Sequence, residues 1–226
     1  MNIREPSTFI KVWDLPTRIF HWALALAVTA LVISAEIGGD AMVWHFRLGY
    51  GVLSLLIFRL VWGFIGGKWS RFNSFNYSLK SVFRYARGER SPAQEVGHNP
   101  LGAWSVFAML FFLLLQVSTG LFSDDEIANA GPLVKFASSA LVNYATFYHK
   151  AIGRLIIFGL VALHIAAIAH HYFVKKDNLI KPMIMGFKPA WFETLGSQDN
   201  LRSRLLAAFI FVLACGFVLL MARLAG

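Results

Sequence analysis

Four histidines lie in one apolar stretch that is long enough to cross a membrane. Residues 147–174 read FYHKAIGRLIIFGLVALHIAAIAHHYFV and contain His149, His164, His170 and His171. Ionisable side chains at membrane depth are rare and are functional candidates by default. On a regular helix, His149 and His164 would lie about 22 Å apart along the axis and only about 60° apart around it. One helix therefore presents two imidazoles near one face, one toward each side of a membrane.

The chain as a whole has the composition of a polytopic membrane protein. Its 226 residues are 57% hydrophobic and only 15% charged, and several apolar runs reach the length that a bilayer requires. Cys215 is the single cysteine, which excludes an intrachain disulfide, and the lack of a CxxCH sequence excludes covalently attached c-type haem. Any haem is therefore expected to be held by side-chain ligands alone.

The distribution of positive charge predicts the orientation in the membrane. We expect five spans, at residues 18–36, 43–65, 101–122, 147–174 and 203–224. Residues 1–18, 66–100 and 175–204 hold 3, 6 and 6 of the 21 lysines and arginines. The positive-inside rule then places the N-terminus in the cytoplasm and the C-terminus outside. Because these loops account for the net charge of +9, we expect membrane lipid as a partner and no nucleic acid.

Histidines in the first two spans supply a partner at each depth. His45, at the outer end of the second span, matches His149, and His21 lies near the inner end of the first span. His164 and His171 compete as the inner partner, because seven residues return to nearly the same helix face. Depth slightly favours His171. Ligands 22 residues apart would, however, separate two haems by about 33 Å, which exceeds the hydrocarbon core, so we choose His164.

Two facing neutral imidazoles in an apolar four-helix core are the usual ligation of haem b. We therefore expect two haem b groups, with His21 and His164 as iron ligands of the inner one and His45 and His149 as iron ligands of the outer one. The alternative for any one of these residues is a hydrogen bond between helices. A proton relay in a transporter without redox chemistry is the alternative for the set.

Glycines recur four residues after two of the histidines. Gly49 follows His45 and Gly153 follows His149, so each glycine lies one turn along on the same face, where a side chain would collide with a porphyrin. Glycine weakens a helix, which favours close approach of a ligand as the reason for both. Ordinary packing between helices, which also uses small residues, is the alternative.

Charged and polar residues near the spans are candidates for the remaining contacts. Arg59 and Arg154 suit haem propionates through charge-assisted hydrogen bonds, although Arg59 could instead extend to the membrane interface. His170, His171 and Lys175 lie at the expected inner surface and form a possible quinone site, with interfacial anchoring as the alternative.

The expected fold is an all-α integral membrane protein, in which a four-helix haem-binding bundle is followed by a fifth C-terminal transmembrane helix. We divide the chain into a cytoplasmic arm at residues 1–17, the dihaem domain at residues 18–185, and a linker with the fifth span at residues 186–226. Within residues 66–100, apolar positions at helical spacing from Phe75 to Ala86 predict an amphipathic surface helix.

Several of these motifs resemble one family, the bacterial cytochrome b561 proteins with the related b-type cytochrome subunit of nickel–iron hydrogenases. The resemblance rests on Phe20-His21-Trp22, His45-x3-Gly49 with Arg59 fourteen residues after the histidine, His149, Leu163-His164, and residues 169–173 (AHHYF). It covers about residues 10–185. The resemblance implies two non-covalent b haems and electron transfer linked to quinone in a bacterial inner membrane. Residues 124–126 (DDE), 98–102 (HNPLG) and 186–189 (GFKP) also resemble a branch of the family that is often associated with periplasmic c-type cytochromes.

The function expected first is therefore an electron conduit between the membrane quinone pool and a periplasmic redox protein such as a c-type cytochrome. The resemblance also admits a superoxide oxidase that passes electrons to quinone, or a dedicated hydrogenase subunit. An anionic substrate such as superoxide favours a positive outer mouth. The expected outer loops instead carry several acidic residues, which suits a cationic protein partner better: Glu36, Asp40, Asp124, Asp125 and Glu126.

Overall fold

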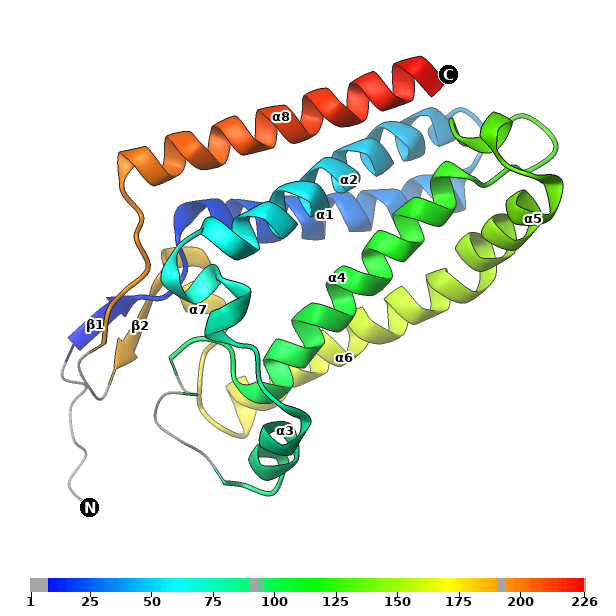
Figure 1. Cartoon of the computed structure of the whole chain (residues 1–226). Coiled ribbons are helices and arrows are strands. Elements are labelled where there is room, and N and C mark those ends of the chain that lie inside the picture. Colours follow the sequence, from blue (N-terminus) through cyan, green and yellow to red (C-terminus); the bar gives the residue numbers. More distant parts are fainter. Residues whose placement is uncertain (1–7, 90–93, 95, 191–193, 226) are drawn as a thin grey trace. The chain divides into compact units, whose positions relative to one another are not determined.

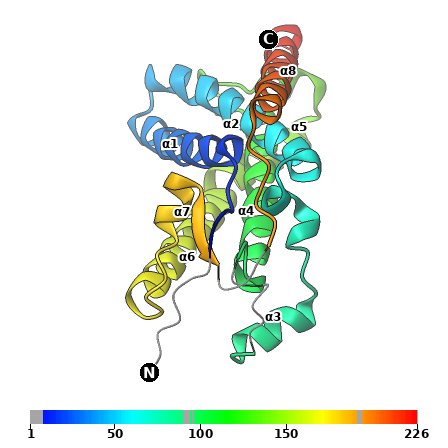
Figure 2. The same cartoon turned by 90° about the vertical axis from the view of Figure 1, so that its left-hand side faces the viewer.

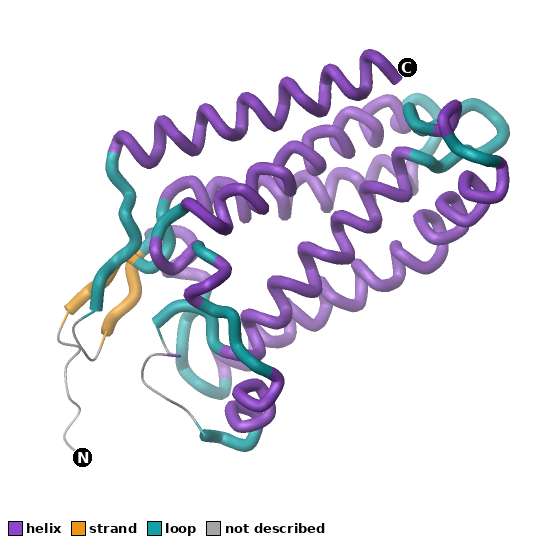
Figure 3. The backbone as a smooth tube through the Cα atoms, in the orientation of Figure 1, coloured by secondary structure: helices purple, strands orange, loops and turns teal. Residues whose placement is uncertain are grey.

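The computed structural model describes residues 8–89, 94, 96–190 and 194–225, and this part of the chain is mainly helical (Figures 1 and 3). Five helical segments among the described residues are long and apolar enough to cross a membrane. They are α1 (Leu15–Ile37), α2 (Ala41–Ile65), α4 (Pro100–Leu121), the run Ser139–Phe173 and α8 (Leu201–Ala225). A bilayer leaves backbone groups no partner but one another, which is why each apolar run is a helix. The prediction of an all-α membrane protein with five spans is confirmed.

The fourth span differs from the regular helix that was expected. It begins at Ser139, earlier in the chain than predicted, and the hydroxyl of Ser138 caps it by accepting a hydrogen bond from the Leu141 N–H at 3.3 Å. It consists of α5 (Ser139–Phe147), a π-helical segment η5 (Tyr148–Gly153) and α6 (Arg154–Phe173). A π-helical turn is wider than an α-helical one, so residues on either side of it change their relative rotation. The expected rotation of about 60° between two of its histidines therefore does not apply.

The connection between α2 and α4 contains the short helices η1 (Lys68–Ser70) and η2 (Phe72–Ser74), followed by α3 (Leu79–Ala86). The helix α3 is the expected surface helix, but it is shorter than predicted. Ser78 caps it, and its apolar side chains Leu79 and Phe83 are exposed. Phe75 lies before the helix and is buried, because it packs with other aromatic rings instead.

The chain divides into two compact units, and the division passes through the five long helices. One unit comprises residues 1–19, 59–107 and 163–208, and the other comprises residues 20–58, 108–162 and 209–226. We call them the terminal unit and the central unit. The terminal unit contains a two-stranded antiparallel sheet of β1 (Thr8–Lys11) and β2 (Phe187–Ala190), visible in Figures 1 and 2, in which Thr8 pairs with Ala190. Part of the predicted N-terminal arm thus pairs with the predicted C-terminal linker. The paired strand of the linker, β2, follows directly after the helix α7 (Ile180–Met185).

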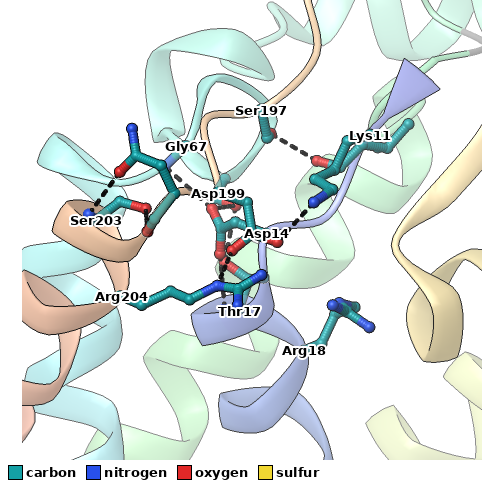
Figure 4. A network of polar contacts seen from close by, with 12 residues as sticks. Lys11, Asp14, Thr17, Arg18, Gly67, Ser197, Asp199, Ser203 and Arg204 are labelled. Atoms are coloured by element: carbon teal, nitrogen blue, oxygen red, sulfur yellow. Dashed lines mark hydrogen bonds and ion pairs between the residues drawn. The ribbon is translucent and has the colours of Figure 1, made fainter.

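A buried carboxylate organises the terminal unit (Figure 4). Asp14 is 0% exposed and caps α1 by accepting the Thr17 N–H at 2.8 Å. The same carboxylate accepts the Gly67 N–H at 3.0 Å, the Ser70 hydroxyl at 2.7 Å and the Trp62 indole N–H at 3.3 Å. A buried charge is tolerated only where hydrogen bonds replace its hydration. These four donors meet that requirement and join the start of α1 to the end of α2.

A second carboxylate joins β1 to the start of α8. Asp199, whose side chain is 1% exposed, accepts from Arg204 Nε at 2.7 Å and from Lys11 Nζ at 3.0 Å. Burial pushes the pKa of Asp199 upward, but the hydrogen bonds from Arg204 and Lys11 outweigh it and hold the pKa at about 2. Nearby, Ser197 donates to the Val12 carbonyl at 2.7 Å, so the linker is also attached to the N-terminal arm through its backbone.

We expect Asp14→Asn to lower stability. An amide offers one acceptor oxygen where the carboxylate offers two, so at least one buried donor loses its acceptor, at a cost of about 1–3 kcal/mol for each group. The midpoint of thermal unfolding in detergent should fall by several degrees. The exposed Asp40→Asn is the matched control and should leave the midpoint unchanged; equal midpoints for the two variants would refute the role of Asp14.

The contribution of Asp199 to the stability of the fold should be lost at acid pH. Its folded pKa of about 2 lies below the ordinary value of 3.8, so the ionised form stabilises the fold above about pH 4 and this contribution disappears as the pH falls toward 2. Asp199→Asn should therefore unfold at a lower temperature than the parent at pH 6, with the difference narrowing by pH 3. A difference that stays constant over this range would contradict the prediction.

Candidate functional site

The structure brings two of the predicted haem ligands together in the central unit. His45 is on α2 and His149 is on η5, and both side chains are partly buried. Their ring centroids lie 6.1 Å apart, with the ring planes at 90°. Two imidazoles that face each other at this distance are in position to share one ligand.

Backbone carbonyls determine which nitrogen of each ring is free. His45 Nδ1 lies 3.0 Å from the Leu31 carbonyl oxygen, and His149 Nδ1 lies 2.8 Å from that of Gln116. A carbonyl oxygen only accepts, so in both rings Nδ1 carries the proton, and a neutral ring then has its lone pair on Nε2. This is the tautomer of a metal-binding histidine whose second nitrogen is held by an outer partner. Ser34 Oγ, at 3.3 Å from His45 Nδ1, adds a second contact to that ring.

The spacing of the two rings also fits haem iron. Histidine nitrogen lies about 2.0–2.1 Å from a bound metal such as zinc, so two histidines that share one metal ion must have their rings close together. The observed separation is 6.1 Å. The residues present therefore fit a bis-histidine haem.

Two residues on α4, Gln116 and Gly120, position His149. The backbone carbonyl oxygen of Gln116 accepts the hydrogen bond from His149 Nδ1–H. The side-chain Nε2 of Gln116 donates to the backbone carbonyl of His149 at 3.0 Å. A side chain at Gly120 would place Cβ 2.8 Å from the ring, so only glycine lets α4 approach this closely. Neither of these two residues was singled out from the sequence. An amide in an apolar span, followed four residues later by glycine, was the available signal.

The two glycines that were predicted to make room for a porphyrin differ. A Cβ at Gly49 would have no atom within 4 Å, so this surface of α2 is open, as the prediction requires. A Cβ at Gly153 would collide with Gln116 Oε1, so the space beside Gly153 is filled by α4. Packing between helices, the alternative named for this position, explains Gly153.

The predicted inner ligands lie in different units. His21, in the central unit, packs edge-on against Trp22 with ring centroids 5.1 Å apart, and its Nδ1 is buried. His164, on α6 in the terminal unit, is partly buried. Their pairing stays a prediction.

The possible quinone site is a polar cluster at the end of α6. Asp177 joins it: His171 Nδ1 lies 3.6 Å from Asp177 Oδ2, and Lys188 Nζ lies 3.2 Å from the same oxygen. Lys175 Nζ lies 3.3 Å from His171 Nε2, so both ring nitrogens of His171 face charged groups. His170 is exposed, with its ring centroid 6.4 Å from that of His171.

The two candidate arginines have different surroundings. Arg59 is 3% exposed, its Cζ lies 4.8 Å from the Phe72 ring centre, and within the described chain its Nη1 is buried with no hydrogen-bond partner. Arg154 is exposed and its Nη1 bonds Glu36 at 3.0 Å. Arg59 therefore interacts with the Asp14 charge but keeps a buried N–H group for a further acceptor, whereas Arg154 is hydrogen-bonded to a carboxylate.

His98 is neutral in the terminal unit. Its ring lies between Trp13 and Phe75, with centroids 4.7 Å and 4.4 Å away, and burial together with the nearby charge of Arg59 lowers the pKa of His98 to about 3. Asn99 is the residue that caps α4, through the Gly102 N–H at 2.8 Å.

One of the acidic residues expected on the outer side, Asp125, is hydrogen-bonded within its own loop. Asp125 accepts the backbone N–H groups of residues 127–129 and the side-chain amide of Asn129, and these hydrogen bonds, the Asn129 side chain first, hold the pKa of Asp125 well below its usual range. Asp125 therefore stabilises the turn. Glu126 is exposed and available to a partner.

Known proteins resemble this chain over most of its length. The family described as prokaryotic cytochrome b561 matches residues 12–186. A "Probable Ni/Fe-hydrogenase B-type cytochrome subunit" from Rhodobacter capsulatus is 27% identical over 217 residues, which cover 80% of this chain and 82% of the relative. The protein of the same name from Azotobacter chroococcum mcd 1 is 25% identical, covering 80% and 89%. The "Probable Ni/Fe-hydrogenase 1 B-type cytochrome subunit" of Escherichia coli K12 is 20% identical, covering 84% and 94%.

The family match begins directly after β1 and ends directly after α7, and it includes all four proposed iron ligands. It agrees with the resemblance inferred from the histidine and glycine motifs. The chain therefore belongs to the prokaryotic cytochrome b561 family and is a multi-pass membrane cytochrome that uses b-type haem in electron transfer.

Proposed function

We propose that this chain conducts electrons across the bacterial inner membrane through two haem b groups, between the quinone pool and a redox protein on the periplasmic side. The observation that carries the proposal is the pair His45 and His149, whose rings lie 6.1 Å apart with both Nδ1 atoms bound to carbonyls. The haem supplies the one-electron chemistry. The chain supplies the ligands, their tautomer and an apolar surrounding.

The Leu31 and Gln116 carbonyls act on the outer haem through the histidines. By accepting hydrogen bonds from the Nδ1–H groups, they orient the rings and make Nε2 a stronger ligand. Gly120 lets α4 bring its carbonyl to His149, and the open surface at Gly49 leaves room beside His45. Each of these residues positions a ligand or the cofactor rather than binding the iron.

We propose His21 and His164 as the ligands of the inner haem. The surroundings of His171 support this choice over the competing residue. Its Nε2 is 3.3 Å from the Lys175 ammonium and its Nδ1 is 3.6 Å from Asp177, so it would have to leave a cluster of charges to bind iron. Arg59, with its buried Nη1, is the better candidate for a propionate; Arg154 would have to exchange Glu36 for one.

The cationic loops support an orientation in which β1, β2, α3 and the His171 cluster lie on the cytoplasmic side. Quinone would then react near His170, His171 and Lys175, where the His171–Asp177 pair could exchange protons with water. The exposed Glu126 would face a cationic periplasmic partner, such as a c-type cytochrome.

A hydrogenase is the second candidate for that partner. The relatives described above carry hydrogenase cytochrome names and are matched over 82–94% of their length. Co-purification of this chain with hydrogenase subunits would favour this alternative. Oxidation of superoxide remains a third possibility for the same haems, with quinone as the acceptor.

Loss of one ligand should remove one haem. His45→Leu and His149→Leu should each lower the haem content from two per chain toward one and should leave the same spectrum, because bis-imidazole ligation requires both nitrogens. His21→Leu and His164→Leu should agree with each other and leave the other haem. Leucine is a good helix former at membrane depth, so the spans should persist. Haem per chain and the reduced-minus-oxidised spectrum measure the result, and full haem content in the His149 variant would refute the outer site.

The choice between the two inner candidates has its own test. His171→Leu should keep two haems with unchanged spectra, because His171 is bound into the surface cluster, whereas His164→Leu should lose one. The opposite result would make His171 the ligand and would leave the two-haem proposal intact.

A further inference from the structure

A cavity of about 400 Å³ that is open on one side lies in the terminal unit, and it shares no lining residue with the cluster at the end of α6. Its walls come from the end of α2, the loop with η2 and the first turns of α4, and the lining residues are Gly63, Phe64, Phe72, Asn73, Asn76 and Phe107. Both helices are membrane spans that end here. The cavity is therefore placed where a molecule dissolved in the bilayer meets the more polar interface.

Aromatic rings form the apolar side of this cavity. The Phe72 ring contacts Phe64 and Phe107, with centroids 5.4 Å and 5.5 Å away. A Cβ at Gly63 would overlap the Phe72 ring, so this glycine is what lets the ring lie flat against α2. Such rings favour a planar, largely apolar ligand through offset or edge contacts.

Amide groups form the polar side. Asn73 and Asn76 are both exposed, and no hydrogen bond of either side-chain amide is found within the described chain. Each amide offers two N–H donors to an acceptor. A hydrocarbon chain would make no use of them, and a phospholipid headgroup would call for a cation in the lining, which contains none.

The cavity also adjoins a residue proposed to bind a haem propionate. Arg59 is one helical turn before Gly63 on the same face of α2, and its guanidinium lies 4.8 Å from the centre of the Phe72 ring. The ring that lines the cavity thus separates it from Arg59. A ligand that exchanges electrons with the haem would need such a position.

We propose that this cavity binds the ring of a membrane quinone. A quinone ring is planar and apolar, carries carbonyl acceptors for Asn73 and Asn76, and enters from the bilayer. Pockets for such ligands are mostly apolar with a few placed polar groups. This inference rests on the proposed quinone-linked function. It moves the binding place of the ring from the His170, His171 and Lys175 cluster to this cavity, and it leaves that cluster only the exchange of protons.

The test uses the full-length, haem-loaded protein and a benzoquinone with a ten-carbon tail. The double variant Asn73→Leu/Asn76→Leu should weaken binding by about tenfold or more, because two hydrogen bonds to the ring are lost. Asn143→Leu, the same change at an exposed position on α5, is the matched control and should bind like the parent. Unchanged haem spectra in both variants will show that the fold and the haem sites are intact.

A photoreactive azido form of the same quinone locates the ring independently. Cross-links to residues 63–76 or 100–107 that a tenfold excess of the unmodified quinone removes would support the cavity. Cross-links to residues 170–175, or equal affinity in the double variant and the parent, would overturn it while leaving the proposed function standing. If the parent binds no quinone and its reduced haem is not oxidised by it, both the cavity and the quinone-linked function fall.

Discussion

The terminal unit depends on one buried charge with a complete set of donors. Asp14 is placed at the start of a membrane helix, where its carboxylate both caps α1 and accepts from the end of α2. Because leaving any of these groups unsatisfied is expensive away from water, the four donors and the carboxylate have only one favourable arrangement. These hydrogen bonds thereby fix the start of α1 against the end of α2. Inside a bilayer the hydrophobic effect does not drive apolar helices together, so polar contacts of this kind supply the specificity.

The central unit applies the same constraint to a cofactor. Both nitrogens of an imidazole in an apolar bundle need a polar partner. Here backbone carbonyls of α1 and α4 accept a hydrogen bond from one nitrogen of each ring. The second nitrogen of each ring is then left for the proposed haem iron. The π-helical segment around His149 is part of this arrangement, since such turns redirect side chains and are frequent at functional sites.

Charged groups beyond the spans divide into those used by the fold and those left for partners. Asp199 and Asp125 are held by their own surroundings and serve the loops that contain them. Arg59 is the exception, because it is buried with an incomplete set of acceptors. Its charge is close enough to interact with the Asp14 carboxylate, but its buried Nη1 still offers donors without an acceptor, which is the physical reason to propose it for a haem propionate.

Hydropathy alone determined the five spans, because a bilayer imposes a length and a composition that are local properties of the chain. The histidine spacing likewise identified the pair His45 and His149, and the motifs around them identified the family before any contact was known. Tertiary structure decided what joins residues distant in sequence: the carbonyls that hold the imidazoles, the pairing of β1 with β2, the donors to Asp14, and Gln116 in the space beside Gly153. These contacts depend on how one helix packs on another, and no periodicity within a single helix encodes them. The π-helical segment belongs to the same class, since its sequence reads as an ordinary helix and only packing against α4 distinguishes it.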